Sequence, residues 1–489
     1  MIKERLISFL SFLIFLWLLI KLVVVHLFWL YLWQRKEYRF DRLLAYWQTL
    51  EGKKQILNTF NPLFLGELRK PKFTLRLLII IIGAILVEYQ FYFVFLRFLG
   101  KLARLWPVFL FPVFALTLLI VFFLTPFLIT GLNILVDLGL KPLCWLIFFL
   151  AKRRLEKIKP LVIGITGSYG KTATKQILQQ VLGVKFKILA TEASINTPLG
   201  VAKVILSKLK EEHEVFIVEM GAYKKGEIKQ LTQLTKPKIG ILTGINPQHG
   251  QLFGNQEKII KTKHELIQAL PKNGLAVFNK ENVITANLAK KTTKVKVKTY
   301  GYPPKNYKTK LLGRFQQLNI QAALVVADYL EVKRTKTLEA IEQLRPTSLT
   351  LRLRKGWQNC LVLDDSHNSN PDGFWEALEV FKSLKAKRKI VITAGIIELG
   401  SASEFVHRRL GKFICKIADY LILTNNNFLK AFQKGVDKSF NKRIEVINKK
   451  IDLKKRLQKL VNKDTVILLE GWNWEAKKIL FPRKSRKNI

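Results

Sequence analysis

Hydrophobic positions divide the chain into two parts. In the first 150 residues, apolar side chains form long runs that cover Leu6–Trp33, Leu77–Phe98 and Trp106–Ile129. Each run is long enough to cross a bilayer, which takes roughly 20 residues of helix. A further stretch, Leu132–Ala151, is interrupted by charges and a proline, and it is either a fourth span or an interfacial helix. We predict about three membrane-spanning helices, with four as the alternative.

After residue 160 the pattern changes to short apolar strands that alternate with amphipathic helices, which is typical of a parallel α/β sheet. A break near Arg345–Pro346 separates two such units. We therefore predict a membrane region at 1–155, a central α/β domain at 156–345 and a Rossmann-like α/β domain at 346–489. The strands are expected at Leu161–Ile165, Val215–Val218, Ile239–Thr243, Cys360–Leu363, Ile390–Ala394, Tyr420–Leu423 and Val466–Leu469.

Basic residues predict the orientation of the helices. Ten lysines and arginines lie between the first two apolar runs, at positions 35–76, and five more follow the last run at 152–159. Loops rich in lysine and arginine stay in the cytoplasm. Three spans with the N-terminus outside place both clusters there, whereas four spans would put the first cluster outside. We expect a multi-pass protein of the cytoplasmic membrane whose α/β domains face the cytoplasm.

Composition narrows the classes of partner. The 489 residues include 82 Lys and Arg against 35 Asp and Glu, a formal net charge of +47, with 49% hydrophobic residues and a mean hydropathy of +0.14. Such a charge is typical of proteins that bind nucleic acid or an anionic membrane. The hydrophobic content excludes a disordered basic protein and argues against an ordinary soluble nucleic-acid binder. We expect contact with membrane lipids and none with nucleic acid. Three distant cysteines exclude a disulfide framework.

A glycine-rich turn follows the first expected strand of the α/β part. Gly164 opens the pattern G-x-x-G-x-x-G-K-T, although Ile165 stands where a strict phosphate-binding loop has its first glycine. Backbone N–H groups of such a turn point at phosphate oxygens, and the next helix adds the partial positive charge of its N-terminus. The lysine reaches the outer phosphates, and the threonine hydroxyl can bind Mg²⁺. We predict an ATP site formed by Gly167, Ser168, Gly170, Lys171 and Thr172.

This loop resembles the one that opens the central domain of the Mur ligase family. Further segments resemble family motifs in the same order over roughly residues 160–480, and the combination is much more specific than any one piece. It is most similar to the branch that joins D-alanyl-D-alanine to a muropeptide. The segments are Val218–Ala222, Gly226–Ile228, Asn246–His249, Lys261–Glu265, Asp364–Pro371 and Ile397–Gly400, followed by His407.

The resemblance implies an ATP-dependent amide-bond ligase of peptidoglycan precursor synthesis that forms a C–N bond through an acyl phosphate. The main barrier is the repulsion between a carboxylate and the nucleotide, so Mg²⁺ and cationic side chains are expected to supply most of the catalysis. The resemblance assigns catalytic roles to Lys171, Glu219, His249 and Lys263. Two Mg²⁺ ions are implied, held by Thr172, Glu219, His249 and a carbamylated Lys263.

Other roles carried over from the family concern the nucleotide and the substrates. Asn319 and Asp365 are expected to contact ATP, and Asp365 follows an apolar strand at the edge where α/β sheets bind ligands. Asn196, Asn368 and Asn370 are expected to contact the muropeptide or the amine substrate.

The sequence departs from the family in three places. Thr350 stands where the family has an arginine, with Arg352 and Arg354 close by, and Glu470 replaces the lysine of a C-terminal K-G-S-R motif. The family's N-terminal domain, which holds the UDP end of the acceptor, has no counterpart, and apolar helices occupy its place. We therefore hypothesise an acceptor that is lipid-linked or close to the membrane.

Three other functions remain as alternatives. One is a ligase acting on another carboxylate, such as a folate or cyanophycin-type chain, and the second is a catalytically weak membrane scaffold that only binds nucleotide. The third, ATP-driven transport, is disfavoured because the spans are few and Glu88 is nearly alone as an intramembrane charge.

Overall fold

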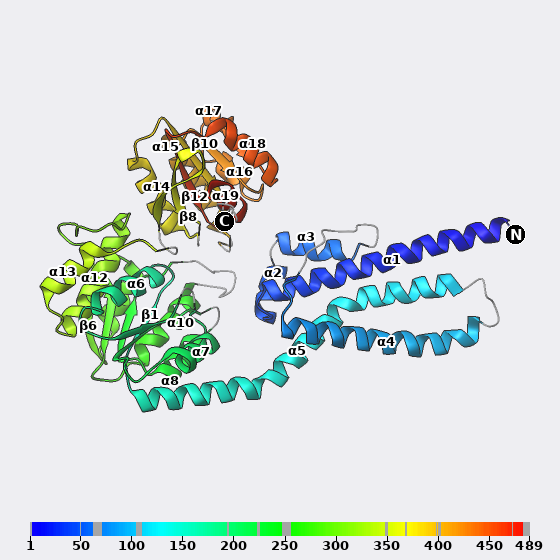
Figure 1. Ribbon diagram of the computed structural model, residues 1–489, viewed down its shortest axis with the longest axis horizontal. Coiled ribbons are helices and arrows are strands. Elements are labelled where there is room, and N and C mark those ends of the chain that lie inside the picture. The colour runs from blue at the N-terminus through cyan, green and yellow to red at the C-terminus, as the bar shows by residue number, and fades with distance from the viewer. Residues whose placement is uncertain are drawn as a thin grey trace, which may run out of the picture. The chain divides into compact units, whose positions relative to one another are not determined.

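The protein is described here by a computed structural model that covers residues 2–48, 50–61, 71–103, 110–192, 195–222, 225–246, 256–347, 351–366, 369–397, 399, 402–471 and 473–482. The chain forms two compact units, Met1–Leu146 and Ile147–Ile489. The first unit is helical, and the second contains two six-stranded sheets (Figure 1).

Apolar helices build the first unit. In the described part of the chain, three helices are long and apolar enough to cross a membrane, in agreement with the three predicted spans. They are α1 (Ile2–Arg35), α4 (Leu75–Ala103) and α5 (Leu110–Ile158), and two short helices, α2 (Phe40–Trp47) and α3 (Leu50–Thr59), connect the first pair.

The segment Leu132–Ala151 forms neither a separate fourth span nor a separate interfacial helix. It continues α5, which is a single helix of 49 residues with Pro126 and Pro142 inside it. Asp137 suggested an interruption, but its carboxylate lies 2.9 Å from the guanidinium of Arg76 on α4. The charge is therefore paired with a neighbouring helix and does not end α5.

The three long helices pack together through large buried side chains such as Trp33, Leu77 and Phe122. A polar pair crosses this packing, with His26 Nε2 of α1 at 2.7 Å from Glu88 Oε1 of α4. The expectation that Glu88 is nearly alone was wrong, because its partner lies 62 residues earlier on another helix.

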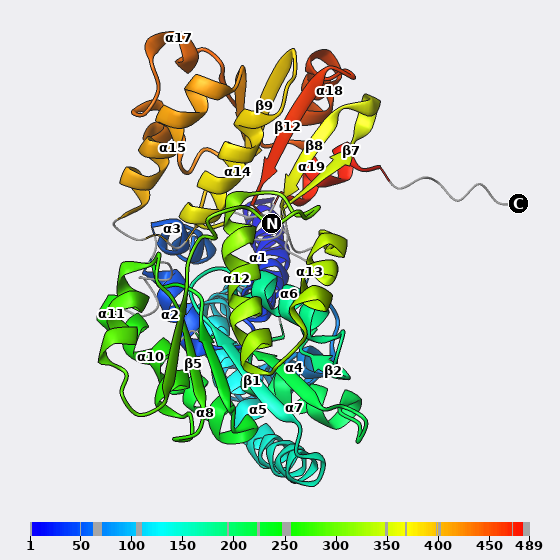
Figure 2. The ribbon, with the colours of Figure 1, turned by 90° about the vertical axis from the view of Figure 1, so that its left-hand side faces the viewer.

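The first sheet is wholly parallel and has the order β2-β3-β1-β4-β5-β6. Apolar side chains along its central strands alternate between two buried clusters, one on each face, so both faces are covered by helices (Figure 2). The strands are β1 (Leu161–Thr166), β2 (Ile188–Ala190), β3 (Val215–Glu219), β4 (Ile239–Leu242), β5 (Leu275–Asn279) and β6 (Lys296–Tyr300).

Different helices cover the two faces of this sheet. The face with α6 (Lys171–Leu182), α12 (Arg314–Tyr329) and α13 (Arg334–Gln343) carries the helix that follows the glycine-rich turn. The opposite face is covered by α7 (Pro198–Lys208), α8 (Glu227–Thr235), α10 (Gln256–Gln268) and α11 (Val283–Lys291).

The second sheet has the order β11-β10-β9-β12-β8-β7, with all pairs parallel except β7 with β8. Helices cover both faces, α14 (Pro371–Ser383), α15 (Ser403–Ile417), α16 (Leu429–Gln433) and α17 (Lys438–Asn441) on one, and α18 (Lys450–Leu460) and α19 (Trp474–Leu480) on the other. The strands are β7 (Arg352–Lys355), β8 (Leu361–Asp365), β9 (Arg388–Thr393), β10 (Tyr420–Leu423), β11 (Ile444–Val446) and β12 (Thr465–Glu470).

Candidate active site

The glycine-rich turn lies between β1 and α6, at the carboxyl edge of the first sheet. Gly167 and Gly170 have φ of +155° and +75°, and a side chain at Gly167 would collide with the Thr243 hydroxyl. The Ser168 N–H donates to the Gly244 carbonyl at 2.7 Å, which fixes the turn against the segment after β4. The turn therefore needs glycine at these positions, and it leads directly into the N-terminus of α6, where an anion is stabilised.

Two lysines meet at this turn from different helices. Lys171 Nζ donates to the Gly167 carbonyl at 2.8 Å, and Lys263 Nζ, from α10, donates to the same oxygen at 2.9 Å. Burial lowers the pKa of both amines, and the charge of Lys171 lowers the pKa of Lys263 further. An anion at the turn would relieve the repulsion between the two amines, as expected of a phosphate site.

Glu219, at the end of β3, is the centre of a buried polar cluster beside the turn. Its Oε2 accepts hydrogen bonds from Thr172 Oγ1 at 3.0 Å and from Lys175 Nζ at 2.9 Å, while its Oε1 accepts one from Asn196 Nδ2 at 3.2 Å. The side chains of Lys175 and Glu219 are 3% and 2% exposed. The carboxylate is thus held in one orientation next to the threonine hydroxyl.

Thr172 and Glu219 are suitable ligands for Mg²⁺, which favours oxygen and commonly takes one or two protein ligands together with nucleotide phosphates. Among the described residues, no group of three or more histidine, cysteine, aspartate or glutamate side chains could hold a metal ion. The two oxygen ligands Thr172 and Glu219 suit an ion that is shared with nucleotide phosphates.

Asn319, on α12, lies against the same turn. Its Oδ1 accepts a hydrogen bond from Thr174 Oγ1 at 3.1 Å, and a side chain at Gly170 would come within 3.2 Å of that oxygen. Its Nδ2 donates to Gln316 Oε1 at 3.2 Å. The structure therefore brings this predicted nucleotide residue to the turn.

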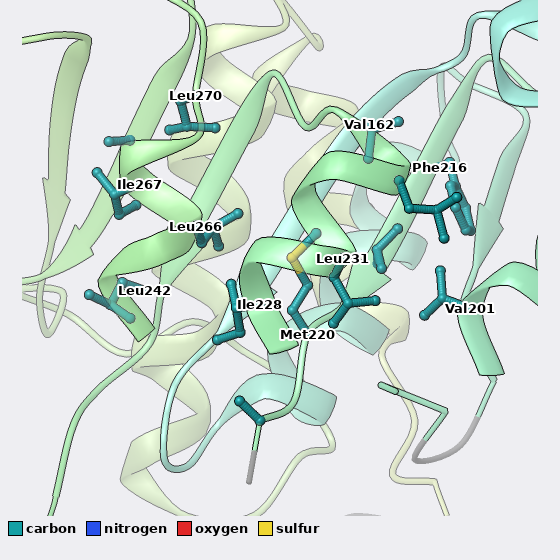
Figure 3. Packing of buried hydrophobic residues seen from close by; sticks show 14 of the residues in the cluster. Val162, Val201, Phe216, Met220, Ile228, Leu231, Leu242, Leu266, Ile267 and Leu270 are labelled. Atoms are coloured by element: carbon teal, nitrogen blue, oxygen red, sulfur yellow. The ribbon is translucent and has the colours of Figure 1, made fainter. Parts of the chain in front are cut away.

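Close packing of α10 on the sheet positions Lys263. Gly164 of β1 and Gly240 of β4 lie opposite each other in register, and a side chain at Gly164 would come 2.8 Å from Leu266 of α10. Figure 3 shows Leu266 within the apolar cluster that also contains Met220. Gly164 thus serves helix packing rather than phosphate contact, and α10 can approach closely enough for Lys263 to reach the turn.

The predicted residues of the second sheet lie at the carboxyl ends of its strands. Asp365 is the last residue of β8, and it is paired in register with Glu470 at the end of β12. Asn370 caps α14 by accepting a hydrogen bond from the Gly373 N–H at 3.0 Å. Arg352 and Arg354, near the missing family arginine, both contact Asp364, at 3.1 and 3.4 Å.

His249, Asn368 and Thr350 lie outside the described residues, and their predicted roles stay predictions. Sequence reasoning missed two residues that matter here. Lys175 binds Glu219, and its position one helical turn after Lys171 was an available signal. Thr243 follows β4 directly and packs on Gly167, whereas the sequence predicted it only as the last residue of a strand.

A glycine turn that opens onto a helix N-terminus, with two lysines and a fixed carboxylate beside it, defines a nucleotide-binding α/β protein of the P-loop type. A model of the Mur ligase middle domain matches residues 165–307, and a model of the Mur ligase glutamate ligase domain matches residues 351–472. Together they cover more than half of the chain, which belongs to the Mur ligase family.

Curated relatives place it near one branch of that family. The chain is 26% identical over 348 residues to the UDP-N-acetylmuramoyl-tripeptide–D-alanyl-D-alanine ligase of Bacillus subtilis, covering 66% of this chain and 75% of the relative. It is 28% identical over 353 residues to the enzyme of the same name from Haemophilus influenzae, covering 66% and 76%. These homologues are MurF ligases, which are ATP-dependent enzymes that form C–N bonds.

Solved structures agree on the fold. MurF from Acinetobacter baumannii superposes with a TM-score of 0.60 at 22% identity, covering 69% of this chain and 79% of that chain. MurF ligase from Thermotoga maritima in complex with ADP superposes with a TM-score of 0.58 at 23% identity, covering 69% and 81%. The predicted α/β fold with parallel sheets is thereby confirmed.

Proposed function

We propose that the protein is an ATP-dependent acid–amino-acid ligase of peptidoglycan precursor synthesis that adds D-alanyl-D-alanine, or a similar amine, to a muropeptide carboxylate. The observation that carries this proposal is the convergence of Lys171, Lys263 and Glu219 on one glycine turn. The names of the curated relatives support the choice of substrates.

The residues at the turn suit the first step of such a reaction. ATP with bound Mg²⁺ would supply the phosphoryl group and neutralise part of its charge. The backbone of 167–170 and the amine of Lys171 would hold the phosphates, and Thr172 and Glu219 would hold one ion. Approach of a carboxylate then meets fixed positive charge rather than bare phosphate oxygens.

Lys263 is proposed to serve the second ion as a carbamate, together with His249. Lys263 is 5% exposed, and its amine lies at the turn. The pKa of this amine is well below that of an ordinary lysine, mainly because the side chain is buried. A neutral amine is the form that reacts with carbon dioxide. These properties are compatible with the carbamate that the resemblance implies, and they support it without requiring it.

The predicted substrate and nucleotide contacts are kept as proposals. Asn196 would face the first ion and the carboxylate substrate, because its amide already binds Glu219. Asp365 would contact the nucleotide, and Asn368 and Asn370 the amine substrate. We also retain three domains, with boundaries near residues 155 and 345.

We propose a cytoplasmic-membrane location with the α/β domains in the cytoplasm and anionic lipids as partners. The helix α2 carries an exposed apolar stripe of Phe40, Leu44 and Trp47, which are 55%, 49% and 37% exposed. It follows directly after α1 and lies in the basic segment 35–76. An amphipathic helix of this kind suits the interface of an anionic leaflet.

We propose further that the acceptor is attached to a lipid or presented at the membrane surface. Apolar helices precede the matched region, which begins at residue 165. A membrane-bound ligase would gain a high local concentration of such an acceptor.

The test is ATP-dependent phosphate release by the purified full chain in detergent, screened against muropeptide acceptors and dipeptide amines. Release that requires both a muropeptide and D-alanyl-D-alanine supports the ligase. If, with the amine present, phosphate is released only when the acceptor is the soluble UDP-linked tripeptide and not when it is lipid-linked, the proposed acceptor is wrong but the proposed chemistry stands. Release with folate-type acceptors only would favour the alternative ligase.

A further inference from the structure

Two carboxyl side chains lie side by side at the carboxyl edge of the second sheet. Asp365 ends β8 and Glu470 ends β12, and the two residues are directly paired in register. Glu470 is fully buried, whereas Asp365 retains partial exposure. Two negative charges on neighbouring strands repel strongly when they are buried, so at least one of the two carboxyl groups must be neutral or paired with a cation.

The hydrogen bonds indicate which carboxyl is neutral. Glu470 Oε1 accepts a hydrogen bond from Ser369 Oγ at 2.6 Å, and the strand register places Asp365 directly beside Glu470. Ionised carboxylates only accept hydrogen bonds, so a bond between two carboxyls requires a proton on one of them. Within the described part of the chain, Glu470 Oε2 is buried and accepts no hydrogen bond, which suits a protonated oxygen that can donate to Asp365.

Among the described residues, the nearby cations contact Asp364 rather than the Asp365–Glu470 pair. Arg352 and Arg354 of β7 contact Asp364, and Lys477 of α19 contacts Asp364 and the Ser366 hydroxyl. From the β9 side, Glu470 is paired with the neutral Thr393.

On that side of the sheet, His407 of α15 lies next to Gly395. Burial lowers the pKa of His407 to about 4, so this imidazole is neutral. Burial raises the pKa of Asp365, and burial with the charge of Asp365 raises that of Glu470 well above the ordinary value.

We propose that Glu470 is a positioning residue for the nucleotide site, and that it acts as a neutral acid whose proton is donated to Asp365. The inference rests on the proposed function, in which Asp365 contacts the nucleotide. In the family motif a lysine occupies the position of Glu470, and a cation there would orient the aspartate at any pH below its own titration. A protonated glutamate gives the same orientation only while it keeps its proton.

Loss of that proton removes the hydrogen bond and places a second negative charge beside Asp365. The repulsion between the two carboxylates then displaces the Asp365 side chain, and its contact with the nucleotide is weakened. Nucleotide affinity should therefore fall as the pH rises, and the effect should depend on residue 470.

The test measures binding of a fluorescent ADP analogue to the full chain in detergent from pH 5.5 to 9. The wild type is expected to lose about tenfold in affinity across this range, the equivalent of one pKa unit of coupling. Glu470→Gln can donate the same hydrogen bond at every pH. The affinity of this variant for the nucleotide should therefore stay, over the whole pH range, near the value that the wild type has at low pH. Glu470→Ala should bind weakly throughout, and Glu475→Gln, an exposed position on α19, should behave as the wild type.

Thermal unfolding gives a second readout that needs no ligand. A carboxyl group whose pKa is raised in the folded state stays protonated there at a pH at which the unfolded chain has already lost the proton. Rising pH therefore favours the unfolded chain, and the free energy of unfolding decreases. The melting temperature of the wild type relative to Glu470→Gln should therefore decline as the pH rises above about 4.3, the ordinary pKa of glutamate.

The possible results separate the two proposals. If the wild type and Glu470→Gln bind nucleotide with the same pH dependence, the inference about Glu470 is wrong and the ligase proposal is unaffected. If neither binds nucleotide at any pH, the ligase proposal fails and the positioning role fails with it. Affinity of Glu470→Gln that stays constant while that of the wild type falls supports the inference.

Discussion

Buried lysines and carboxyl groups determine the chemistry of this protein at the scale of single residues. Lys171 and Lys263 share one carbonyl oxygen, and Glu219 is held by Thr172, Lys175 and Asn196. The two amines lie side by side at the turn, whereas the Glu219 carboxylate is paired with the Lys175 amine. The site is therefore preorganised for a highly charged ligand, which is where electrostatic catalysis is most effective.

Removal of the Lys171 amine tests the phosphate site. Lys171→Ala should reduce ATP-dependent phosphate release by about 10²–10³-fold, the usual cost of losing one preorganised charge donor. Lys203→Ala, an exposed lysine on α7, is the matched control and should keep wild-type activity. Cell-wall growth that persists with Lys171→Ala at normal protein levels would instead favour the nucleotide-binding scaffold.

Lys175 should matter for stability as well as for the metal. Lys175→Met leaves the Glu219 carboxylate buried without its cation, and breaking such a pair costs about 3–5 kcal/mol. The free energy of unfolding in urea measures this loss. The double variant Lys175→Met with Glu219→Gln should regain most of it, because no unpaired charge then remains. Equal stability of the single and double variants would show that the pair does not act as described.

At the scale of elements, two glycines on adjacent strands decide where α10 lies. Because Gly164 and Gly240 have no side chains, Leu266 packs directly on the strands and Lys263 reaches the turn between β1 and α6. A glycine in a central strand is usually a cost to strand stability. Here the absence of a side chain allows Lys263 to reach the turn from a neighbouring helix.

A bulky residue at Gly164 should displace α10. Gly164→Val is expected to cost about 1–3 kcal/mol through overpacking and to lower activity through the shift of Lys263. Leu266→Ala in the same chain removes the side chain that would clash and should restore part of both losses. Thermal unfolding and phosphate release measure the two effects. An unchanged activity of Gly164→Val would mean that the position of α10 is not limiting.

Parts of this arrangement could be predicted from sequence because they are local. The strand, turn and helix from Leu161 to Leu182 form one continuous pattern, and the central strands β1, β3 and β4 are mostly apolar, with Thr166 and Glu219 only at strand ends. The edge strands β2, β7 and β11 are short, and β6 is rich in lysine, so the pattern did not reveal them. The buried strand β5 was overlooked.

Pairs that join distant segments could not be predicted. Asp365 and Glu470 meet only because β8 and β12 are neighbours in the sheet, and His26 meets Glu88 only because α1 packs on α4. Such contacts depend on strand order and helix rotation, which periodicity does not determine. The resemblance to family motifs singled out Glu219 and Lys263, and the structure places both side chains beside the glycine turn.

At the scale of the whole molecule, the chain combines the two matched Mur ligase domains with apolar helices that precede them. In the described part of the chain, three helices are long and apolar enough to span a membrane, and the end of the last one, α5, lies in a basic segment at 152–159. Positive charge on the cytoplasmic side then predicts an external N-terminus and internal catalytic domains.

Protease protection of tagged protein tests this topology. An N-terminal tag should be digested on intact spheroplasts, whereas a C-terminal tag should be digested only after the membrane is opened. Tags that behave alike would require an even number of spans and would contradict three spans. A tag at each end of a cytoplasmic protein of the same cells serves as the control for membrane integrity.

The central claim is that a nucleotide bound at the turn before Lys171 activates a carboxylate for attack by an amine. Mass spectrometry of the products formed by the full chain from ATP, a muropeptide acceptor and D-alanyl-D-alanine tests it most directly. The account predicts one new amide bond for each phosphate released, and loss of both products in Lys171→Ala. Phosphate release without any amide product, under conditions in which a MurF relative makes it, would contradict the account.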